Sequence, residues 1–212
     1  MSSAPHDILW SPTLEQIERA GITHFARSAA ARFQPVASIR TYSELHRWSI
    51  QEPALFWQHV WQFCGVIGEQ GSVVVQPAAR FSDWRFFPEA TLNFAENLLQ
   101  PQRLQDSQFA AAVAVVEVDE LEQRRQLSRL QLWQEVCRFT QYLQSCGVTT
   151  GDRVAAVLPN RLEAVIAMLA TAAIGAIWSG CSPDFGDDAL YDRFSQIQPK
   201  LLIGAEQVRY NG

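Results

Sequence analysis

Two short loops in the C-terminal half of the chain hold the residues with the best spacing for binding a ligand. The dipeptide Pro159-Asn160 follows the apolar run 154–158, and the stretch SGCSPDFG occupies residues 179–186. In folds whose strands and helices alternate, ligands bind beyond the carboxyl ends of parallel strands, where such loops lie. The glycines, proline and small polar residues of 179–186 favour close approach of a ligand to the backbone. Composition alone leaves a plain connecting loop as the alternative.

Other familiar binding chemistries find no support in the sequence. Of the 17 lysines and arginines only Lys200 is a lysine, and it precedes Leu201, so there is no Gly-Lys-Ser/Thr phosphate loop. The four cysteines show no CxxC pair and no zinc-type spacing. They are interpreted as small core residues, with a reactive thiol as the alternative. We therefore assign no metal ligand, and none of these patterns indicates a catalytic residue.

A strand, a helix and a second strand are predicted around these loops. The apolar run 154–158 favours a strand, and residues 163–174 are rich in Ala, Leu and Met, which favours a helix. Gly175 ends that helix, because a left-handed closing residue costs glycine least. Residues 176–179 then indicate the second strand. The run is apolar almost throughout, which is typical of a parallel sheet covered by helices.

Flanking segments extend the same alternation. One strand is predicted at 109–118, a second beyond the charged turn 119–129, and a third at 201–203. Helices are predicted at 130–147 and 187–198. The stripe of the first of these helices is predicted to be Leu130, Trp133, Cys137, Thr140 and Leu143, and that of the second Leu190, Phe194 and Ile197. We expect residues 109–203 to contribute strands to a mainly parallel sheet, with Ile166 and Leu169 buried.

The preceding residues indicate helices. Ser11-Pro12 fits a helix start and Gly21 a stop, and Ser49-x-x-Glu52 resembles a capping box. The helix after it would carry the apolar stripe Phe56, Trp57, Val60, Trp61 and Cys64. The polar stretch 101–107 marks a domain boundary. The predicted fold class is α/β: a helical N-terminal cap region, 1–106, followed by the first part of a mainly parallel sheet domain, 107–212.

Charge and hydropathy exclude several classes of partner. A net charge of −5 at pH 7 argues against a nucleic-acid-binding surface, which needs clustered Lys and Arg. Only 15 residues lie uninterrupted between Glu163 and Ser179, whereas a membrane-spanning helix needs about 20. The N-terminal residues lack a charged segment followed by an apolar one. We expect a cytoplasmic protein with no membrane span.

Four stretches of the sequence carry a resemblance to a known family. They are LWSPTLEQI, FWQHVWQFCGVIGE, RFFPEATLNFAENLL, and the run from GDRVAAVLPN through IWSGCSPDFG, and the closing RYNG also fits. Together they resemble the N-terminal part of the acetoacetyl-CoA synthetase (acetoacetate–CoA ligase) family, within the adenylate-forming acyl-CoA synthetase superfamily. GDRVAAVLPN is common to the superfamily, whereas RFFPEATLNFAENLL with IWSGCSPDFG indicates the acetoacetate branch.

The resemblance implies an acid–thiol ligase that converts acetoacetate, ATP and CoA to acetoacetyl-CoA, AMP and pyrophosphate through an acyl-adenylate, with Mg²⁺ screening the phosphates. It covers only the early part of the family's chain, so we expect a fragment that is inactive alone and binds no cofactor tightly. By analogy, Gly180 lines the path of the pantetheine arm and Arg193 meets a CoA phosphate, to which its planar fork is suited. The alternative for Arg193 is a solvent-facing helical arginine.

Two other function classes remain as alternatives. A nucleotide-binding oxidoreductase shares the fold class, but no GxGxxG follows the first good strand. A non-catalytic interaction module derived from an acyl-CoA synthetase is the second alternative.

Overall fold

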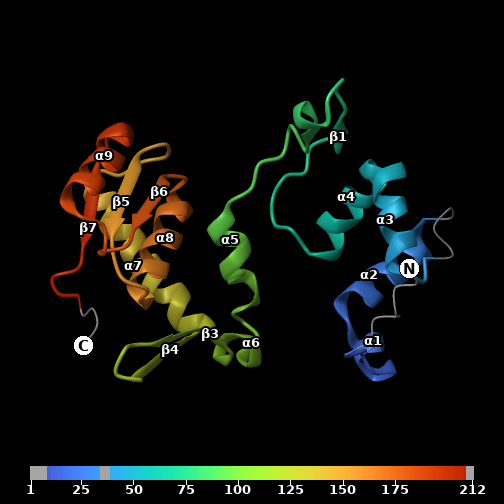
Figure 1. Ribbon diagram of the computed structural model, residues 1–212, viewed down its shortest axis with the longest axis horizontal. Coiled ribbons are helices and arrows are strands. Elements are labelled where there is room, and N and C mark those ends of the chain that lie inside the picture. The colour runs from blue at the N-terminus through green and yellow to red at the C-terminus, as the bar shows by residue number, and fades with distance from the viewer. Residues whose placement is uncertain (1–8, 34–38, 209–212) are drawn as a thin grey trace, which may run out of the picture. The chain divides into compact units, whose positions relative to one another are not determined.

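The computed structural model describes residues 9–33 and 39–208, and its contacts divide the chain into the units Met1–Thr91 and Leu92–Gly212 (Figure 1). Each unit is described by itself. Residues 209–212, which include the RYNG stretch, and residues 1–8 at the N-terminus lie outside the described residues. Among the described residues, no helix is both long and apolar enough to cross a membrane.

The first unit is mainly helical. Its elements are α1 (Leu14–Arg19), α2 (Gly21–Arg32), α3 (Tyr42–Gln51), α4 (Pro53–Phe63), β1 (Val75–Gln76), a 3-10 turn (Phe81–Asp83) and β2 (Arg85–Phe86). The short strands β1 and β2 pair antiparallel. The predicted helical character of this region is confirmed.

The predicted helix starts of the first unit are wrong, because other residues make the caps. Thr13, not Ser11-Pro12, caps α1, and Thr41 caps α3, each in a reciprocal capping box with the residue three positions on. Ser49 lies inside α3, where its hydroxyl donates to the His46 carbonyl at 2.7 Å, so it caps no helix. Pro53 opens α4, a position where its missing N–H costs nothing.

An aromatic cluster around one histidine forms the core of the first unit. Phe25, Ala29, Leu45 and Trp48 are buried, and Phe56 and Val60 of the predicted stripe pack against them. Trp57 and Cys64 of that stripe are exposed instead. His59 occupies the inward position in α4, only 4% exposed, with the rings of Phe25, Phe33, Trp48 and Phe63 around it.

The second unit contains the alternating strands and helices. Its elements are α5 (Phe94–Leu99), a 3-10 turn (Pro101–Arg103), α6 (Ser107–Ala111), β3 (Val113–Val118), β4 (Arg124–Ser128), α7 (Arg129–Ser145), β5 (Arg153–Val157), α8 (Leu162–Ile174), β6 (Ile177–Cys181), α9 (Asp187–Ile197) and β7 (Leu201–Gly204). Strands β6, β5 and β7 form a parallel sheet in that order. The predicted α/β class and the strand–helix–strand unit at its centre are therefore confirmed.

Strands β3 and β4 do not join that sheet, so among the strands predicted in 109–203 only β5, β6 and β7 form it. They pair with each other as an antiparallel hairpin, whose turn is held by the Asp119 carboxylate accepting from the Leu121 and Gln123 N–H groups. The predicted strand at 109–118 also begins later. The Asp106 carboxylate caps α6 by accepting from the Gln108 and Phe109 N–H groups, which makes the start of that segment helical.

The core of the second unit lies between the sheet and the helices α5, α7 and α8. Val154, Ala155 and Ala156 of β5 are fully buried. Leu169 is buried as predicted, whereas Ile166 is only partly buried. The buried residues of α7 are Leu132, Val136 and Leu143. Of the five residues in the predicted stripe, only Leu143 is therefore fully buried. Gly175 closes α8 in the left-handed region, with φ of 78°, as predicted.

The division between the two units lies before α5. Helix α5 packs on α7 and α8, and its capping residue Asn93 donates from Nδ2 to the Ala172 carbonyl at 2.9 Å. Contacts thus group α5 with the sheet unit, earlier than position 106. The predicted functional boundary between 1–106 and 107–212 stays a prediction.

An ion pair between Lys200 and Asp152 lies at the amino ends of β5 and β7. Lys200, just before β7, donates from Nζ to the Asp152 carboxylate at 2.8 Å and also to the Gly147 carbonyl. Asp152 further accepts from the Thr149 N–H and hydroxyl groups. These donors, Lys200 first, lower the pKa of the Asp152 carboxyl to about 2. The contact joins the turn before β5 to the start of β7.

Protonation of His59 should weaken the first unit. Its Nε2 lies 2.8 Å from Ser28 Oγ and 3.3 Å from the Phe25 carbonyl oxygen, while Nδ1 is buried with no hydrogen-bond partner among the described residues. An imidazolium would thus bury a second N–H donor without an acceptor, which costs free energy. Burial, assisted by Arg32, lowers the pKa of His59 below its usual 6.5.

We expect the free energy of unfolding of the first unit to be fully retained above about pH 6.5 and to fall as the pH drops through the lowered folded-state pKa of His59. The measurement is urea unfolding between pH 7.5 and 5 (roughly the range over which histidine titrates), followed by tryptophan fluorescence. His59→Gln should flatten this pH dependence, whereas His46→Gln, at an exposed histidine of α3, should leave it intact. Equal pH dependence in the wild type and His59→Gln would contradict the assignment.

Candidate functional site

A cavity lies at the carboxyl ends of β5 and β6, where the sequence predicts ligand binding. Its volume is about 910 Å³. One wall is the tip of the β3–β4 hairpin, and the other walls are the Pro159-Asn160 loop and the segment from Trp178 to Asp184. Both predicted loops therefore contribute to one cavity. A second hollow of about 770 Å³, between α7, α8 and the end of β7, shares Leu158, Pro159 and Arg161 with it.

Gly180 lines this cavity, but from a strand and not from a loop. The prediction that the loop begins at residue 179 is wrong, because Ser179, Gly180 and Cys181 pair with β5, with Gly180 opposite Ala156. A Cβ atom at Gly180 would lie 3.2 Å from Trp178 Nε1. Any side chain there would push against the indole, so the position keeps bare backbone at the cavity wall.

The loop that follows β6 is held by its own polar groups. Ser182 donates from its hydroxyl to the Asp184 carboxylate at 2.9 Å, and the Phe185 N–H donates to the Ser182 carbonyl at 3.3 Å. Gly186 then forms the N-cap of α9 without a side-chain cap. This short turn places Phe185 directly before the helix.

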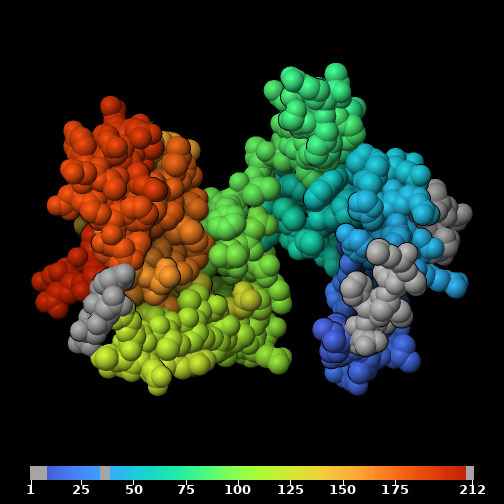
Figure 2. Space-filling view, in the orientation of Figure 1, coloured from blue at the N-terminus to red at the C-terminus, as the bar shows by residue number. Residues whose placement is uncertain are grey.

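Arg193 lies on the exposed side of α9, and the atoms of this helix are at the surface on the face shown in Figure 2. The buried side of α9 contains Phe194, with Leu190 and Ile197 partly buried, as the predicted stripe requires. The Arg193 guanidinium carbon is 4.5 Å from the centre of the Phe185 ring. The structure thus brings Arg193 to the loop after β6, while Gly180 lines the cavity. Their roles as CoA contacts stay predictions.

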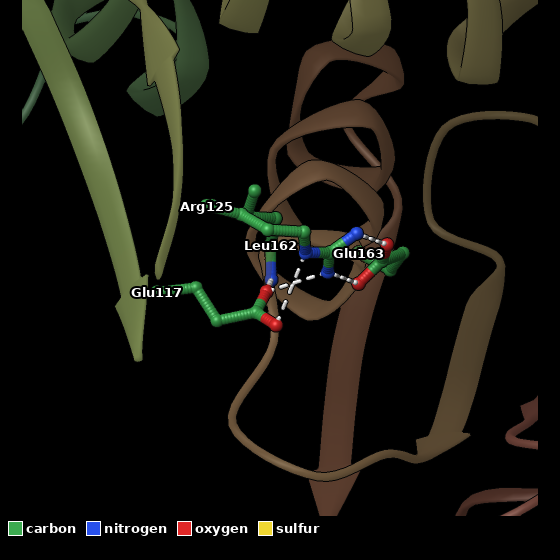
Figure 3. A network of polar contacts seen from close by, with 4 residues as sticks. All are labelled: Glu117, Arg125, Leu162 and Glu163. Carbon is green, nitrogen blue, oxygen red and sulfur yellow. Dashed lines mark hydrogen bonds and ion pairs between the residues drawn. The ribbon is translucent and has the colours of Figure 1, made fainter. Parts of the chain in front are cut away.

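A network of charges that sequence reasoning missed fixes the cavity wall. The Glu117 carboxylate accepts from Arg125 Nη2 at 2.6 Å and from Nε at 3.2 Å (Figure 3). The same carboxylate accepts from the Leu162 N–H at 2.8 Å, at the start of α8. Arg125 turns its other edge to Glu163, with nitrogen–oxygen distances of 2.9 and 3.0 Å. The hairpin is in this way tied to α8.

Glu117 takes the place of a missing helix cap. The N-cap residue Arg161 makes no side-chain cap, so the Glu117 carboxylate supplies both the acceptor and the negative charge that suit a helix N-terminus. Glu163 and Glu117 together raise the pKa of Arg125, and Arg125 lowers the pKa of Glu163. The sequence shows one signal of this contact: Glu117 interrupts the valine-rich run VAVVEV, where an inward charge needs a partner.

The cysteines divide into two groups. Cys137 and Cys181 are partly buried, and burial raises the pKa of the Cys137 thiol, in agreement with a core role. Cys64 and Cys146 are exposed, so the interpretation of all four as core residues is wrong for these two. Within the part of the chain that the structure describes, no three His, Cys, Asp or Glu side chains gather as metal ligands would.

Comparison with protein families gives two matches. A family model described as AMP-binding enzyme matches residues 103–211, and one described as acetyl-coenzyme A synthetase N-terminus matches residues 42–98. The first match includes every element from α6 to β7, and with them the cavity and the Glu117 network.

Individual relatives agree with these matches. An acetoacetyl-coenzyme A synthetase of Rhizobium meliloti is 43% identical over 96% of this chain and 30% of that protein. A malonamoyl-CoA synthetase of Penicillium aethiopicum is 40% identical over 82% of this chain and 24% of that protein. Among solved structures, acetoacetyl-CoA synthetase from Streptomyces lividans is similar with a TM-score of 0.84 at 35% identity, covering 95% of this chain and 30% of that one. The chain therefore spans about 30% of the length of such relatives.

Alanine substitutions in the Glu117 network should lower the free energy of unfolding of the second unit by amounts that decrease from Arg125 to Glu117 to Glu163. Arg125→Ala leaves the buried Glu117 carboxylate without a countercharge, and we expect a loss of about 3 to 5 kcal/mol. Glu117→Ala removes a charge-assisted bond and a helix cap, for about 2 to 3 kcal/mol. Glu163→Ala removes only the ion pair between Arg125 and Glu163, in which both side chains are about half exposed, and we expect a loss of about 1 kcal/mol or less.

Urea unfolding monitored by circular dichroism measures these three losses. The double variant Glu117→Ala with Arg125→Ala should be more stable than Arg125→Ala alone, because the unpaired carboxylate is gone. A loss for Glu163→Ala as large as that for Arg125→Ala would show that the buried contact does not dominate.

Proposed function

The chain belongs to the AMP-binding enzyme family, and on that premise we propose that it forms the N-terminal part of an acetoacetate–CoA ligase. The observation that carries the proposal is the 43% identity to an acetoacetyl-coenzyme A synthetase over 96% of the chain. The complete enzyme would use acetoacetate, ATP and CoA, and release acetoacetyl-CoA, AMP and pyrophosphate. A cytoplasmic location, the use of Mg²⁺ and the lack of a nucleic-acid partner remain predictions from the sequence.

The proposed reaction has two half-reactions. A carboxylate oxygen of acetoacetate bonds to the α-phosphorus of ATP, and the bond to the β-phosphate oxygen breaks, which releases pyrophosphate. The CoA sulfur, having lost its proton, then bonds to the acyl carbon, and AMP leaves with the electron pair of the broken carbon–oxygen bond. Mg²⁺, when bound, would screen the phosphate charge in the first half-reaction.

Residues of this chain are proposed to act in the second half-reaction. Gly180 offers bare backbone at the wall of the cavity, which suits a narrow pantetheine arm, because any Cβ atom would press on Trp178. Arg193 presents a guanidinium beside the loop after β6, and its planar fork can donate to two phosphate oxygens at once. The described residues thus fit CoA on both counts.

The relatives also narrow the class of acid. Acetoacetate and malonamate carry the same carboxylate and the same carbonyl two carbons away, and differ only in a methyl or an amino group on that carbonyl. Since relatives named for each acid are similarly close, at 43% and 40% identity, a short 3-oxo acid is the substrate class that we propose.

Pyrophosphate exchange tests the proposed ligase. A chimera joins residues 1–212 to the remaining part of the Rhizobium meliloti relative, so that the matching segment is replaced. We expect this chimera to exchange labelled pyrophosphate into ATP with acetoacetate or malonamate, and much less with acetate. Residues 1–212 alone should give no exchange, because their sequence has no Gly-Lys-Ser/Thr loop to hold the β- and γ-phosphates. Exchange with acetate but with neither 3-oxo acid would overturn the substrate class.

The CoA contact has its own test in the same chimera. Losing a charge-assisted phosphate contact costs about 1.5 to 3 kcal/mol, so Arg193→Ala should raise the apparent KM for CoA roughly tenfold to a hundredfold. Pyrophosphate exchange does not use CoA and serves as the internal control. Arg138→Ala, at an exposed arginine of α7 that pairs with Glu135, should leave the KM for CoA unchanged. An unchanged KM in Arg193→Ala would mean that this arginine faces only solvent.

A further inference from the structure

Arg193 is held by an aromatic ring, although acidic residues are abundant around it. Its guanidinium carbon lies 4.5 Å from the centre of the Phe185 ring, and among the described residues it makes no ion pair. Four aspartates precede it within nine residues along the chain: Asp184, Asp187, Asp188 and Asp192. A long flexible cation in such a setting would ordinarily pair with a carboxylate, so the absence of a pair calls for a physical cause.

The helix itself supplies part of that cause. A helical side chain meets those three and four positions away, and for Arg193 these are Ala189, Leu190, Gln196 and Ile197. None of them is acidic. Long helical side chains also point back toward the helix N-terminus, which for α9 is the end where Phe185 lies. The ring therefore meets the guanidinium before any aspartate on the same face could.

Stacking on a ring leaves the donors of an arginine available. The guanidinium carbon of Arg193 lies over the Phe185 ring, and a ring attracts the cation without accepting a conventional hydrogen bond from each of its N–H groups. A carboxylate partner would instead occupy two of these donors, as Glu163 does with Arg125 in the same unit. The stacked arginine consequently keeps a complete edge for an external oxyanion.

We propose that Phe185 is a positioning residue for Arg193: its ring keeps the guanidinium away from the neighbouring aspartates and presents it to a phosphate of CoA. The inference rests on the proposed function, since it needs the CoA contact of Arg193. An arginine that pairs with a carboxylate gives up two of its donors to that partner and is less available to a phosphate. A ring can hold the cation without neutralising it.

The loop geometry allows the ring to be changed without unfolding the loop. Phe185 is 39% exposed, and the turn is held by the Ser182–Asp184 contact and by the Phe185 backbone N–H, none of which involves the ring. Phe185→Leu removes the aromatic face and keeps an apolar side chain. Phe185→Tyr keeps the face and is the matched conservative variant.

The experiment compares CoA with pantetheine, a thiol that lacks every phosphate, as acyl acceptors of the chimera. Phe185→Leu should raise the apparent KM for CoA roughly twofold to fivefold, the size expected for an exposed cation–π contact, while kcat and the use of pantetheine stay constant. Phe185→Tyr, which retains the aromatic ring, should have the same KM for CoA as the wild type. In the Arg193→Ala background, Phe185→Leu should have no further effect, because the two residues act as one unit.

Different outcomes overturn different claims. An unchanged KM for CoA in Arg193→Ala removes the CoA contact and with it that part of the proposed function. A raised KM in Arg193→Ala with a wild-type KM in Phe185→Leu leaves the contact and overturns only the role of Phe185. Equal losses with CoA and pantetheine in Phe185→Leu would mean that the ring supports the fold, which also overturns the inference.

The stack can be measured on residues 1–212 without any activity. The ring current of Phe185 should displace the Arg193 Nε–H resonance in NMR spectra, and Phe185→Leu should return it to the position of an ordinary exposed arginine. An identical resonance in both proteins would rule out the stack in solution and therefore the proposal.

Discussion

A buried carboxylate is stable only when hydrogen-bond donors replace the water that it has lost. In the second unit this applies to Glu117, whose side chain is only 8% exposed. Its donors come from Arg125 on the neighbouring strand and from the backbone at the start of α8. Two of these three elements, β3 and α8, also line the cavity, together with the turn between β3 and β4. The hydrogen bonds of one buried carboxylate thus help to fix the hairpin wall relative to the start of α8, in addition to the apolar contacts of Val115 and Leu127 with the core.

Two arginines of the same unit are held by opposite means. Arg125 is saturated, because carboxylates occupy both edges of its guanidinium, and this suits a residue whose task is to hold elements together. Arg193 lies over the Phe185 ring and pairs with no carboxylate of the described residues. An arginine that binds a ligand cannot also be fully paired within its own chain. The difference in partners therefore separates a structural arginine from one available to a ligand more clearly than exposure does.

Sequence reasoning succeeded where the signals were local. The apolar run of β5, the helix α8 and its closure at Gly175 each depend on residues within one turn or one strand, so their bounds were predicted closely. It failed where a distant or competing partner decided. Asp106 made the start of a valine-rich segment helical, and α3 continued through Ser49, so that α4 began at Pro53 without the predicted box. Gly180 belongs to β6 because its backbone pairs with β5, which the local sequence does not show. The Glu117 contact could be predicted only if the antiparallel pairing of β3 and β4 were known.

The ion pair between Lys200 and Asp152 has a consequence for how the molecule can be handled. Lys200 is the only lysine in the sequence, and it lies at the amino ends of the strands, whereas the cavity opens at their carboxyl ends. Among the side chains, Lys200 is consequently the single target of reagents that acylate amines, and a dye attached there would leave the mouth of the cavity clear. Since acylation removes the charge that Asp152 pairs with, such labelling would also loosen the turn before β5. Reductive alkylation with an aldehyde that carries the label retains the charge and is the gentler way to modify Lys200.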